Sequence, residues 1–440
     1  MLRVYAKIQT LILVLFSTVL LSGCNGNVGS YSPWSSSNNI NTGVMSNNPE
    51  SMPNIAWQTP GERQVLSDQS AAGVPVPPAT PVPPVASEAV PAAPHQKIIV
   101  SILLPLSGTK SGLGQSMLKA AQMALFDIGS ANFELVPRDT KSTRDGTIAA
   151  AQSALNAHSA LILGPIFADD LKAIKPIVSP THTPIIAFTT DWTLAGDNTY
   201  IMGFLPFTQV MRVVKYAQDH GYSKLAVYAP QTDYSDVVIS TLQKSGIPVV
   251  HVNRYSPKQM DLSASVQQFA TSSKSGEGFD FDALMLPLGS EGLRTLVTKL
   301  NSNGISQRNV KFIGTGLWDD ATLYNNPALY GGWFSAPDPD LRADFEKRYQ
   351  ENYGAAPLRL SSLAYDATAL AAVLARSAPD ASATYTQQAI TNPRGFAGID
   401  GIFRFRNDGL SERGLAVLEL RSGSPKVVDP APTAFVSSGT

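Results

Sequence analysis

The chain has 440 residues, with 33 lysines and arginines against 34 aspartates and glutamates. This even balance gives no argument for nucleic-acid binding, and 43% hydrophobic residues indicate a globular protein with a sizeable core. The single cysteine excludes a disulfide within the chain. The five histidines are dispersed without metal-ligand spacing, so we predict no metal and no cofactor.

The first 24 residues have the features of an export signal. Basic residues precede an apolar run over 8–21, which is shorter than the roughly 20 residues of a membrane span. The run ends in Leu21-Ser22-Gly23-Cys24, and small residues before a cysteine resemble a bacterial lipoprotein signal. We expect residues 1–23 to be a signal peptide and Cys24 to carry lipid, so that the protein is tethered to a membrane without spanning it. The alternative is an ordinary signal peptide with a chance cysteine.

Residues 24–96 have the composition of a disordered tether. The first part is rich in serine, asparagine and glycine, and eight prolines fall within 74–94. Proline fixes φ and removes a backbone donor, so this second part should be extended at about 3.1 Å per residue. A long tether implies that the folded part works away from the membrane. An inert spacer is the simpler interpretation.

Strands and helices alternate from residue 97 onward. Short apolar runs predict buried parallel strands, and helical spacing of apolar residues predicts the helices between them. The strands expected in the first half are 98–104, 133–136, 160–163 and 185–188, with helices over 115–128 and 147–155. The alternation then restarts, with strands at 225–228, 247–252, 283–286 and 310–313 and helices at 210–220, 237–244, 341–353 and 360–376. This pattern predicts an α/β fold with two doubly wound parallel-sheet lobes.

Several short motifs then make the chain recognisable. It resembles the type I periplasmic-binding-protein superfamily, in particular the Leu/Ile/Val-binding branch, over about 97–425. The matching stretches are Leu103-Leu104-Pro105-Leu106-Ser107-Gly108, Leu163-Gly164-Pro165, Pro184-Ile185-Ile186-Ala187-Phe188, Tyr365-Asp366-Ala367 and Phe396-Ala397-Gly398. The resemblance implies two lobes joined by three crossovers, with ligand in a cleft at the carboxyl ends of the strands.

The resemblance also implies a division of the chain. Lobe 1 should comprise 97–208 and 336–397, and lobe 2 should comprise 209–335 and 398–425. Residues 426–440 are expected to form a flexible tail.

Family members that bind amino acids suggest which residues line the cleft. The residues implied here are Ser107, Gly108, Leu113, Thr189, Thr190, Tyr234 and Trp318. Thr189 and Thr190 could donate to a ligand carboxylate, and Tyr234 stands where a tyrosine of the second lobe is expected. Ala168 and Asp169 stand where a serine would help, and a carboxylate there would repel a ligand carboxylate. Loop capping or packing between the lobes is the alternative for Thr189, Thr190, Tyr234 and Trp318.

Within the superfamily, the lipoprotein signal and the Leu-Pro-Leu-Ser-Gly stretch look like penicillin-binding protein activators. These are outer-membrane lipoproteins that contact a peptidoglycan synthase. Asn25, in place of aspartate, also favours the outer membrane. The resemblance thus implies a non-enzymatic, lipid-anchored periplasmic regulator of peptidoglycan synthesis whose partner is a penicillin-binding protein. The helical repeat domain of the best-known activators has no counterpart here, which puts contact by the same surface in question.

The alternative is a substrate-binding lipoprotein of an ABC transporter for an amino acid or amide, which would bind such a small ligand. An acyltransferase is disfavoured. Two Ser-x-x-Lys matches begin at Ser107 and Ser116, but the chain holds no Lys-Thr-Gly to complete that chemistry.

Overall fold

A computed structural model of the protein describes residues 97–129, 133–259, 261–377 and 384–435. These residues belong to one compact unit that covers 88–440. The expected signal peptide, the lipidated Cys24 and the tether lie outside the described residues and stay predictions. None of the helices in the described ranges is long and apolar enough to cross a membrane.

Lobe 1 is built on a parallel sheet of five strands in the order β2-β1-β3-β4-β5. The strands are β1 (Ile98–Leu104), β2 (Phe133–Asp139), β3 (Leu161–Leu163), β4 (Ile185–Ala187) and β5 (Thr199–Ile201). Six of the seven residues of β1 are buried, because this strand lies inside the sheet with helices on both faces.

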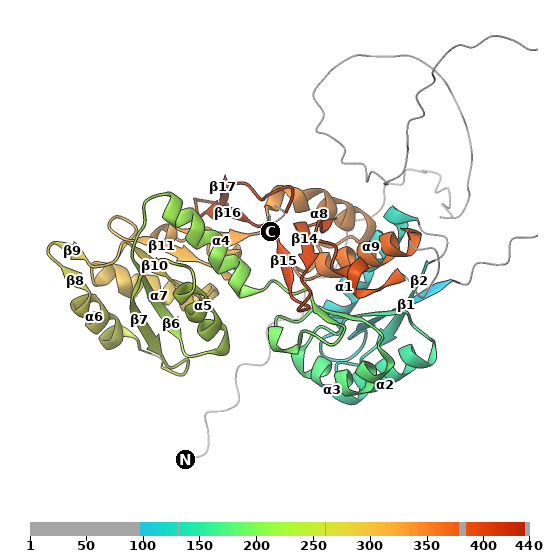
Figure 1. Ribbon diagram of the computed structural model, residues 1–440. Coiled ribbons are helices and arrows are strands. Elements are labelled where there is room, and N and C mark those ends of the chain that lie inside the picture. The colour runs from blue at the N-terminus through green and yellow to red at the C-terminus, as the bar shows by residue number, and fades with distance from the viewer. Residues whose placement is uncertain (1–96, 130–132, 260, 378–383, 436–440) are drawn as a thin grey trace, which may run out of the picture. The chain divides into compact units, whose positions relative to one another are not determined.

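Helices cover both faces of the sheet of lobe 1 (Figure 1). They are α1 (Ser111–Ile128), α2 (Arg144–Asn156), α3 (Ala168–Val178), α9 (Ser361–Ser377) and the single turn α11 (Gln387–Ile390). A further helix, α8 (Pro339–Tyr353), packs on α1. The core of one face holds residues of α1 and α9, and that of the other face holds residues of α2 and α3. Alanines at 121, 364 and 367 bring α1 and α9 close together, because their side chains occupy little space.

Lobe 2 is built on a sheet of seven strands in the order β17-β16-β12-β11-β10-β6-β7. The strands are β6 (Leu225–Pro230), β7 (Val249–Tyr255), β10 (Ala283–Met285), β11 (Lys311–Gly314), β12 (Trp333–Ala336), β16 (Ala416–Glu419) and β17 (Lys426–Asp429). Five of them are parallel, whereas β16 and β17 add an antiparallel edge.

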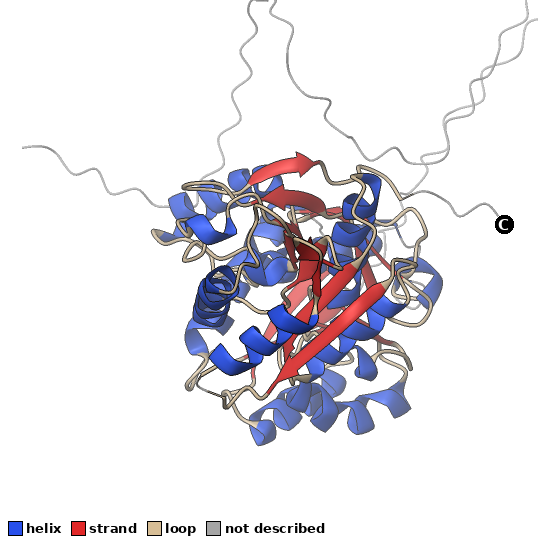
Figure 2. Ribbon diagram, turned by 90° about the vertical axis from the view of Figure 1, so that its left-hand side faces the viewer, coloured by secondary structure: helices blue, strands red, loops and turns tan. Residues whose placement is uncertain are grey.

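Helices also cover both faces of the second sheet (Figure 2). They are α4 (Pro206–Asp219) and α5 (Asp233–Gln243) on one face, and α6 (Ser263–Ser272) and α7 (Ser290–Ser302) on the other. Short elements in the connections are the hairpin of β8 (Lys274–Ser275) and β9 (Gly278–Phe279) and the 3-10 turns η1 (Ser179–Thr181), η2 (Trp192–Leu194), η3 (Gly316–Trp318) and η4 (Pro327–Leu329).

The chain crosses between the lobes three times, after β5, after β12 and before β16. The predicted α/β architecture of two parallel-sheet lobes with three crossovers is therefore confirmed. Because each lobe is assembled from separated stretches of chain, neither lobe is a continuous segment. The strands that feed the crossovers end on the side where the lobes meet.

The end of the chain differs from the expected division. A small antiparallel sheet of β13 (Phe396–Gly398), β14 (Gly401–Phe405) and β15 (Ser411–Arg413) packs on lobe 1. Its aromatic side chains belong to the core of lobe 1, where the Phe405 ring meets Tyr200 at a centroid distance of 5.4 Å. The assignment of 398–413 to lobe 2 is therefore wrong, and only the chain from β16 onward joins that lobe.

The flexible tail predicted to begin at residue 426 is also wrong at its start. β17 pairs with β16 and extends the sheet of lobe 2. Arg212 of α4 forms an ion pair with Asp429 at 2.7 Å and donates from its Nε to the carbonyl oxygen of Leu415. These contacts attach the last described strand to the helical layer of lobe 2.

Candidate functional site

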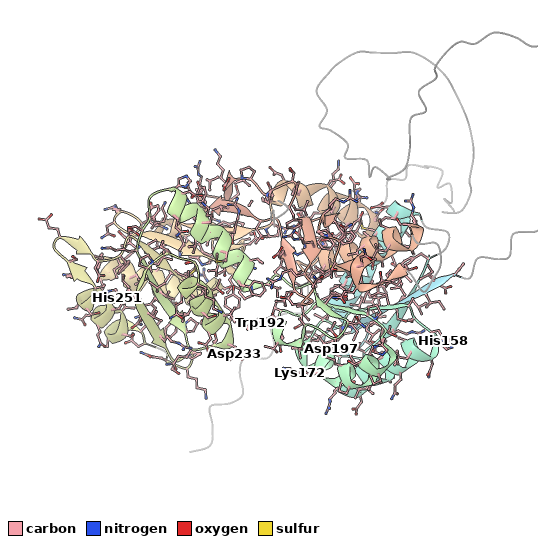
Figure 3. All side chains as sticks on the ribbon, in the orientation of Figure 1. His158, Lys172, Trp192, Asp197, Asp233 and His251 are labelled. Carbon is pink, nitrogen blue, oxygen red and sulfur yellow. The ribbon has the colours of Figure 1, made fainter. Side chains whose placement is uncertain are left out.

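A cavity of about 740 Å³ lies beyond the carboxyl ends of the parallel strands and is lined from both lobes. Lobe 1 contributes the first turns of α3 and the loop after β4, and lobe 2 contributes α5. Figure 3 shows Lys172 and Trp192 of lobe 1 and Asp233 of lobe 2 in this region. The lining residues are Ala168, Lys172, Thr189, Thr190, Asp191, Trp192, Thr193, Pro206, Asp233, Tyr234, Asp236, Val237 and Ser240.

The loop after β4 forms one wall of this cavity. Thr189 is almost fully buried, and its hydroxyl accepts a hydrogen bond from the Asp191 backbone N–H at 3.1 Å. Thr190 is exposed, and its hydroxyl has no hydrogen-bond partner among the described residues. Thr189 therefore shapes the loop, whereas Thr190 is free to donate to a ligand.

A lysine and two carboxylates lie beside this loop. The Lys172 ammonium lies 3.2 Å from the Asp191 carboxylate and 3.8 Å from that of Asp169. Burial raises the pKa of Asp191, but the hydrogen bonds from Thr193 and Lys172 lower it by more. The net pKa of Asp191 is therefore below its usual value. Asp191 is therefore ionised at neutral pH, and it already neutralises the lysine.

The opposite wall is the beginning of α5. The Thr232 hydroxyl caps this helix by accepting from the Ser235 N–H, which fixes the first turn. Within that turn the Tyr234 hydroxyl donates to the Thr315 hydroxyl at 2.7 Å, and burial raises the pKa of Tyr234 to about 12. Asp233 is exposed and makes no ion pair with any described residue, so its carboxylate is available to a ligand.

Two predicted site residues, Ser107 and Gly108, lie outside the lining of the cavity. The Ser107 hydroxyl donates to the Asp139 carboxylate at 2.6 Å, and the Ser107 and Leu106 backbone N–H groups donate to the same carboxylate at 3.1 and 2.9 Å. Gly108 has φ of +82°, and a Cβ there would lie 2.6 Å from the Lys141 carbonyl oxygen. Both residues therefore hold the loop between β1 and α1 against the end of β2.

Trp318 and Leu113, which were also predicted to line the cleft, pack against the cores of the lobes. Trp318 is fully buried in the core of lobe 2, and its indole N–H donates to the Leu286 carbonyl oxygen at 3.1 Å. It cannot contact a cleft ligand in this structure, so its proposed ligand role is wrong. Leu113 is half-buried against the core of lobe 1 and does not line the cavity.

The carboxylate expected to repel a ligand at residue 169 is not part of the lining. The Asp169 side chain is 97% exposed, whereas Ala168 and Asp191 line the cavity. Sequence reasoning missed Asp191, Asp233 and Lys172. Asp191 directly follows Thr190, and Asp233 directly precedes Tyr234. Both aspartates lie in segments that follow a strand, and this position was the signal that could have identified them. Lys172 offered none, because α3 was not predicted.

The arrangement suits binding better than covalent chemistry. Its hydroxyls, aromatic rings and charged groups come from two lobes around an open volume, as in ligand pockets generally. No group of three or more metal-ligating side chains occurs within the described ranges.

Comparison with known proteins identifies the family. The family model described as periplasmic binding protein matches residues 97–425. The chain belongs to this family. The family implies a periplasmic location, and the resemblance seen in the motifs is confirmed at this level.

Solved structures share the fold. A putative branched-chain amino acid ABC transporter protein of Rhodospirillum rubrum has a TM-score of 0.67 at 17% identity, covering 76% of this chain and 100% of its own. A substrate-binding protein of Streptococcus pneumoniae, solved with isoleucine, has a TM-score of 0.54 at 19% identity, covering 76% and 100%. A solute-binding protein of R. palustris, solved with benzoate, has a TM-score of 0.54 at 14% identity, covering 78% and 98%.

A curated relative is an uncharacterised protein of Rickettsia prowazekii. It is 24% identical over 149 residues, which is 34% of this chain and 40% of the relative. The match thus spans well under half of that protein. The solved relatives are named as binding proteins or transporter components and not as enzymes.

Proposed function

We propose that this protein is a periplasmic solute-binding protein without enzymatic activity, and that it holds a small ligand bearing an ammonium group in the cleft between its lobes. The observation that carries the proposal is the cavity of about 740 Å³, which brings together Thr189, Thr190 and Tyr234 from two separate lobes. Its volume is in the range of pockets that hold small molecules.

The charges of the cavity favour the ammonium group. The lining includes three carboxylates, from Asp191, Asp233 and Asp236, and one cation, Lys172. Lys172 is neutralised by Asp191, and Asp236 is paired with Arg254. Asp233 remains without a partner among the described residues. An unpaired carboxylate at the rim of the cleft attracts a cationic group and disfavours a ligand whose only charge is negative.

An amino acid or its amide fits this distribution. Its ammonium group would approach Asp233, and its carboxylate or amide oxygen would accept from the Thr190 hydroxyl on the opposite wall. Benzoate, the ligand of the R. palustris protein, has a carboxylate without a cation and should bind this chain poorly. The substrate-binding relatives support an assignment to an ABC transporter for such solutes.

The test is calorimetric titration of the folded unit with the common amino acids, their amides and benzoate. We expect at least one amino acid or amide to bind, and Asp233→Asn to weaken it by about tenfold, or about 1.4 kcal/mol. Asp219→Asn is the matched control, because Asp219 lies at the far end of α4 outside the cavity. Tight binding of benzoate with none of amino acids or amides would contradict the proposal.

A second candidate is the regulator of peptidoglycan synthesis, anchored by lipid at Cys24 and acting by contact with a penicillin-binding protein. One observation favours it: Lys172, the cation of the cavity, is already paired by Asp191 and Asp169 and is not free to receive a ligand carboxylate. The lipoprotein signal and the tether support it as well, and outer-membrane anchoring belongs to the same proposal.

The same titration separates the two candidates when it is joined to crosslinking in cells. A regulator would bind no amino acid or amide and would be captured with a bifunctional penicillin-binding protein, and Cys24→Ser would abolish the capture. A solute receptor would bind its ligand and show no such capture.

A further inference from the structure

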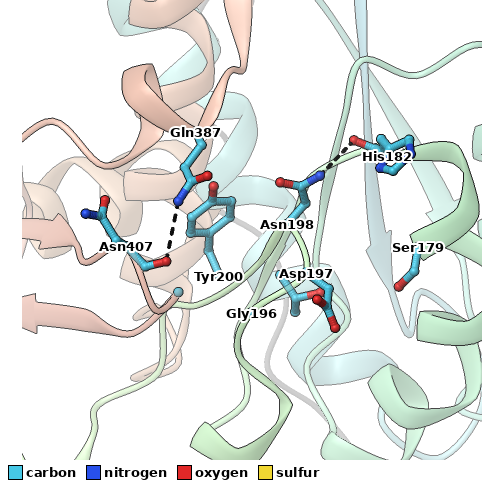
Figure 4. Close-up of a pocket in the computed structure, with 10 residues that line it drawn as sticks. Ser179, His182, Gly196, Asp197, Asn198, Tyr200, Gln387 and Asn407 are labelled. Carbon is cyan, nitrogen blue, oxygen red and sulfur yellow. Dashed lines mark hydrogen bonds between the residues drawn. The ribbon is translucent and has the colours of Figure 1, made fainter.

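A second pocket lies wholly within lobe 1, away from the cleft (Figure 4). Its volume is about 360 Å³, and none of its lining residues lines the cleft cavity. It lies between the turn after α3, the segment leading into β5, the single turn α11 and the connection between β14 and β15. The lining residues are Ser179, His182, Gly196, Asp197, Asn198, Thr199, Tyr200, Gln387, Asn407 and Gly409.

The pocket is polar but carries little charge. Three separate elements each contribute an amide side chain, namely Asn198, Gln387 and Asn407. The only carboxylate of the lining, Asp197, lies 3.9 Å from the ammonium of Lys175. An amide group offers both donors and an acceptor, which matches a hydroxyl group that also donates and accepts. The lining therefore suits an uncharged ligand with many hydroxyls better than an anion or an apolar compound.

Two hydroxyls of the lining have unused hydrogen-bonding capacity. Thr199 is 1% exposed, and its hydroxyl has no partner among the described residues. Tyr200 is 3% exposed, and its hydroxyl also makes no hydrogen bond within the described part of the chain. Figure 4 shows the Tyr200 ring beside Gln387, whose amide donates to the Asn407 carbonyl oxygen. Buried polar groups are nearly always partnered, and the Thr199 hydroxyl is an exception to this rule. The Tyr200 hydroxyl is not fully buried, so it is the one that a ligand in the pocket can reach.

The polar surface continues into an adjoining pocket of about 490 Å³. The two pockets share His182, Asn198 and Gln387. The second adds the hydroxyl residues Ser159, Thr181, Thr183 and Thr386. We refer to these two adjoining pockets together as the groove.

We propose that this groove is a second ligand site, which binds a neutral oligosaccharide through its amides and hydroxyls. The site is independent of the cleft and goes beyond the proposed solute-binding function. The connected pockets would each receive one sugar unit, and the shared amides of Asn198 and Gln387 would contact the link between the units.

The structure offers two variants that remove single groups with little strain. Asn198 has a left-handed φ of +59°, a conformation that glycine adopts freely, so Asn198→Gly removes the amide without straining the backbone. Tyr200→Phe removes only the hydroxyl and keeps the ring contact with Phe405. Asp219→Asn is the control, because Asp219 lines neither the groove nor the cleft cavity.

The experiment is saturation-transfer NMR of the folded unit with maltose, cellobiose and N,N′-diacetylchitobiose, followed by titration. We expect at least one of these neutral disaccharides to bind, and each groove variant to weaken it by about fivefold or more. Asp219→Asn should bind as the wild type does. Binding of none of the three disaccharides, or binding that is unchanged in both Asn198→Gly and Tyr200→Phe, would overturn the proposal. If Asn198→Gly does not fold, Tyr200→Phe decides the outcome alone.

Discussion

Asp139 is the residue on which the loop between β1 and α1 depends. Its carboxylate accepts from the Ser107 hydroxyl and from the backbone N–H groups of Leu106, Ser107 and Lys141. Burial raises the pKa of Asp139, but these hydrogen bonds lower it by more. The net pKa of Asp139 is therefore below its usual value. Ser107, which the sequence suggested as a ligand contact, thus holds this loop in place through Asp139; we call this set of hydrogen bonds the clamp.

This clamp predicts a pH-dependent contribution to stability. A carboxyl with a lowered pKa in the folded state stabilises above its unfolded pKa of about 3.9, and this stabilisation disappears as the pH falls through the folded pKa. We expect Asp139→Asn to lower the free energy of unfolding by about 1 kcal/mol at pH 7, allowing for solvent screening.

Urea denaturation at pH 7 and at pH 3 measures this effect. The difference between Asp139→Asn and wild type should shrink at pH 3, whereas Asp169→Asn, an exposed control, should show little change at either pH. Ser107→Ala should lose part of the same stability without affecting ligand binding. An equal difference at both pH values would show that the charge of Asp139 does not matter.

At the scale of single residues, the sequence could predict the position of a side chain only where that residue lies close in the chain to a recognisable strand. Thr189 and Thr190 come just after the end of β4, and Tyr234 lies in the first turn of the helix that follows β6, so their place at the carboxyl edge could be inferred. Trp318 also follows a strand, but η3 turns its side chain back into the core, where it packs beside Phe334 at a centroid distance of 6.3 Å. A tertiary contact of this kind leaves no local signal.

Secondary-structure elements were predictable in proportion to their length and periodicity. The long amphipathic helices and the apolar strands β1 and β6 agree with the sequence pattern. α3 escaped prediction, because a proline at 176 interrupts its apolar spacing. β5 and β12 were missed as well, since runs of three or four residues carry little periodic information.

The last strand gives a test at this scale. β17 contributes half-buried Val427 and Val428, which pack beside the two cores of lobe 2, and Asp429 pairs with Arg212. We expect truncation after Gly423 to lower the free energy of unfolding by about 2–4 kcal/mol, mainly from lost apolar burial. Truncation after Phe435 keeps every described residue and is the control. Thermal unfolding of the two chains measures the difference, and equal midpoints would mean that β17 does not stabilise the lobe.

At the scale of the whole molecule, the crossovers make each lobe depend on distant parts of the chain. Lobe 1 takes its first five strands from 98–201, but α9 and the aromatic residues of β13 and β14 complete its core. Contacts between the lobes add to this dependence. The Asp319 carboxylate of lobe 2 lies 3.8 Å from Arg359 and 4.0 Å from Arg342 of lobe 1. The general two-lobe plan was predictable from the order of strands and helices in the sequence. The return of β13–β15 to lobe 1 was not predictable, because alternating aromatic residues in a strand do not indicate which lobe they will pack on.

This interdependence predicts how fragments behave. The stretch 97–208 carries all five strands of the first sheet, but without α9 one face of that sheet exposes residues such as Ile102, Leu104 and Leu163, which are fully buried in the whole protein. Since a sheet of this kind is stable only with both faces covered, we expect the fragment 97–208 to lack a cooperative unfolding transition and to show collapsed amide dispersion by NMR. The fragment 88–440 should unfold cooperatively with the stability of the full chain, and adding the peptide 355–415 to 97–208 should restore part of the dispersion. A cooperative unfolding transition in the fragment 97–208 alone would show that lobe 1 folds without the later helices, and it would contradict this prediction.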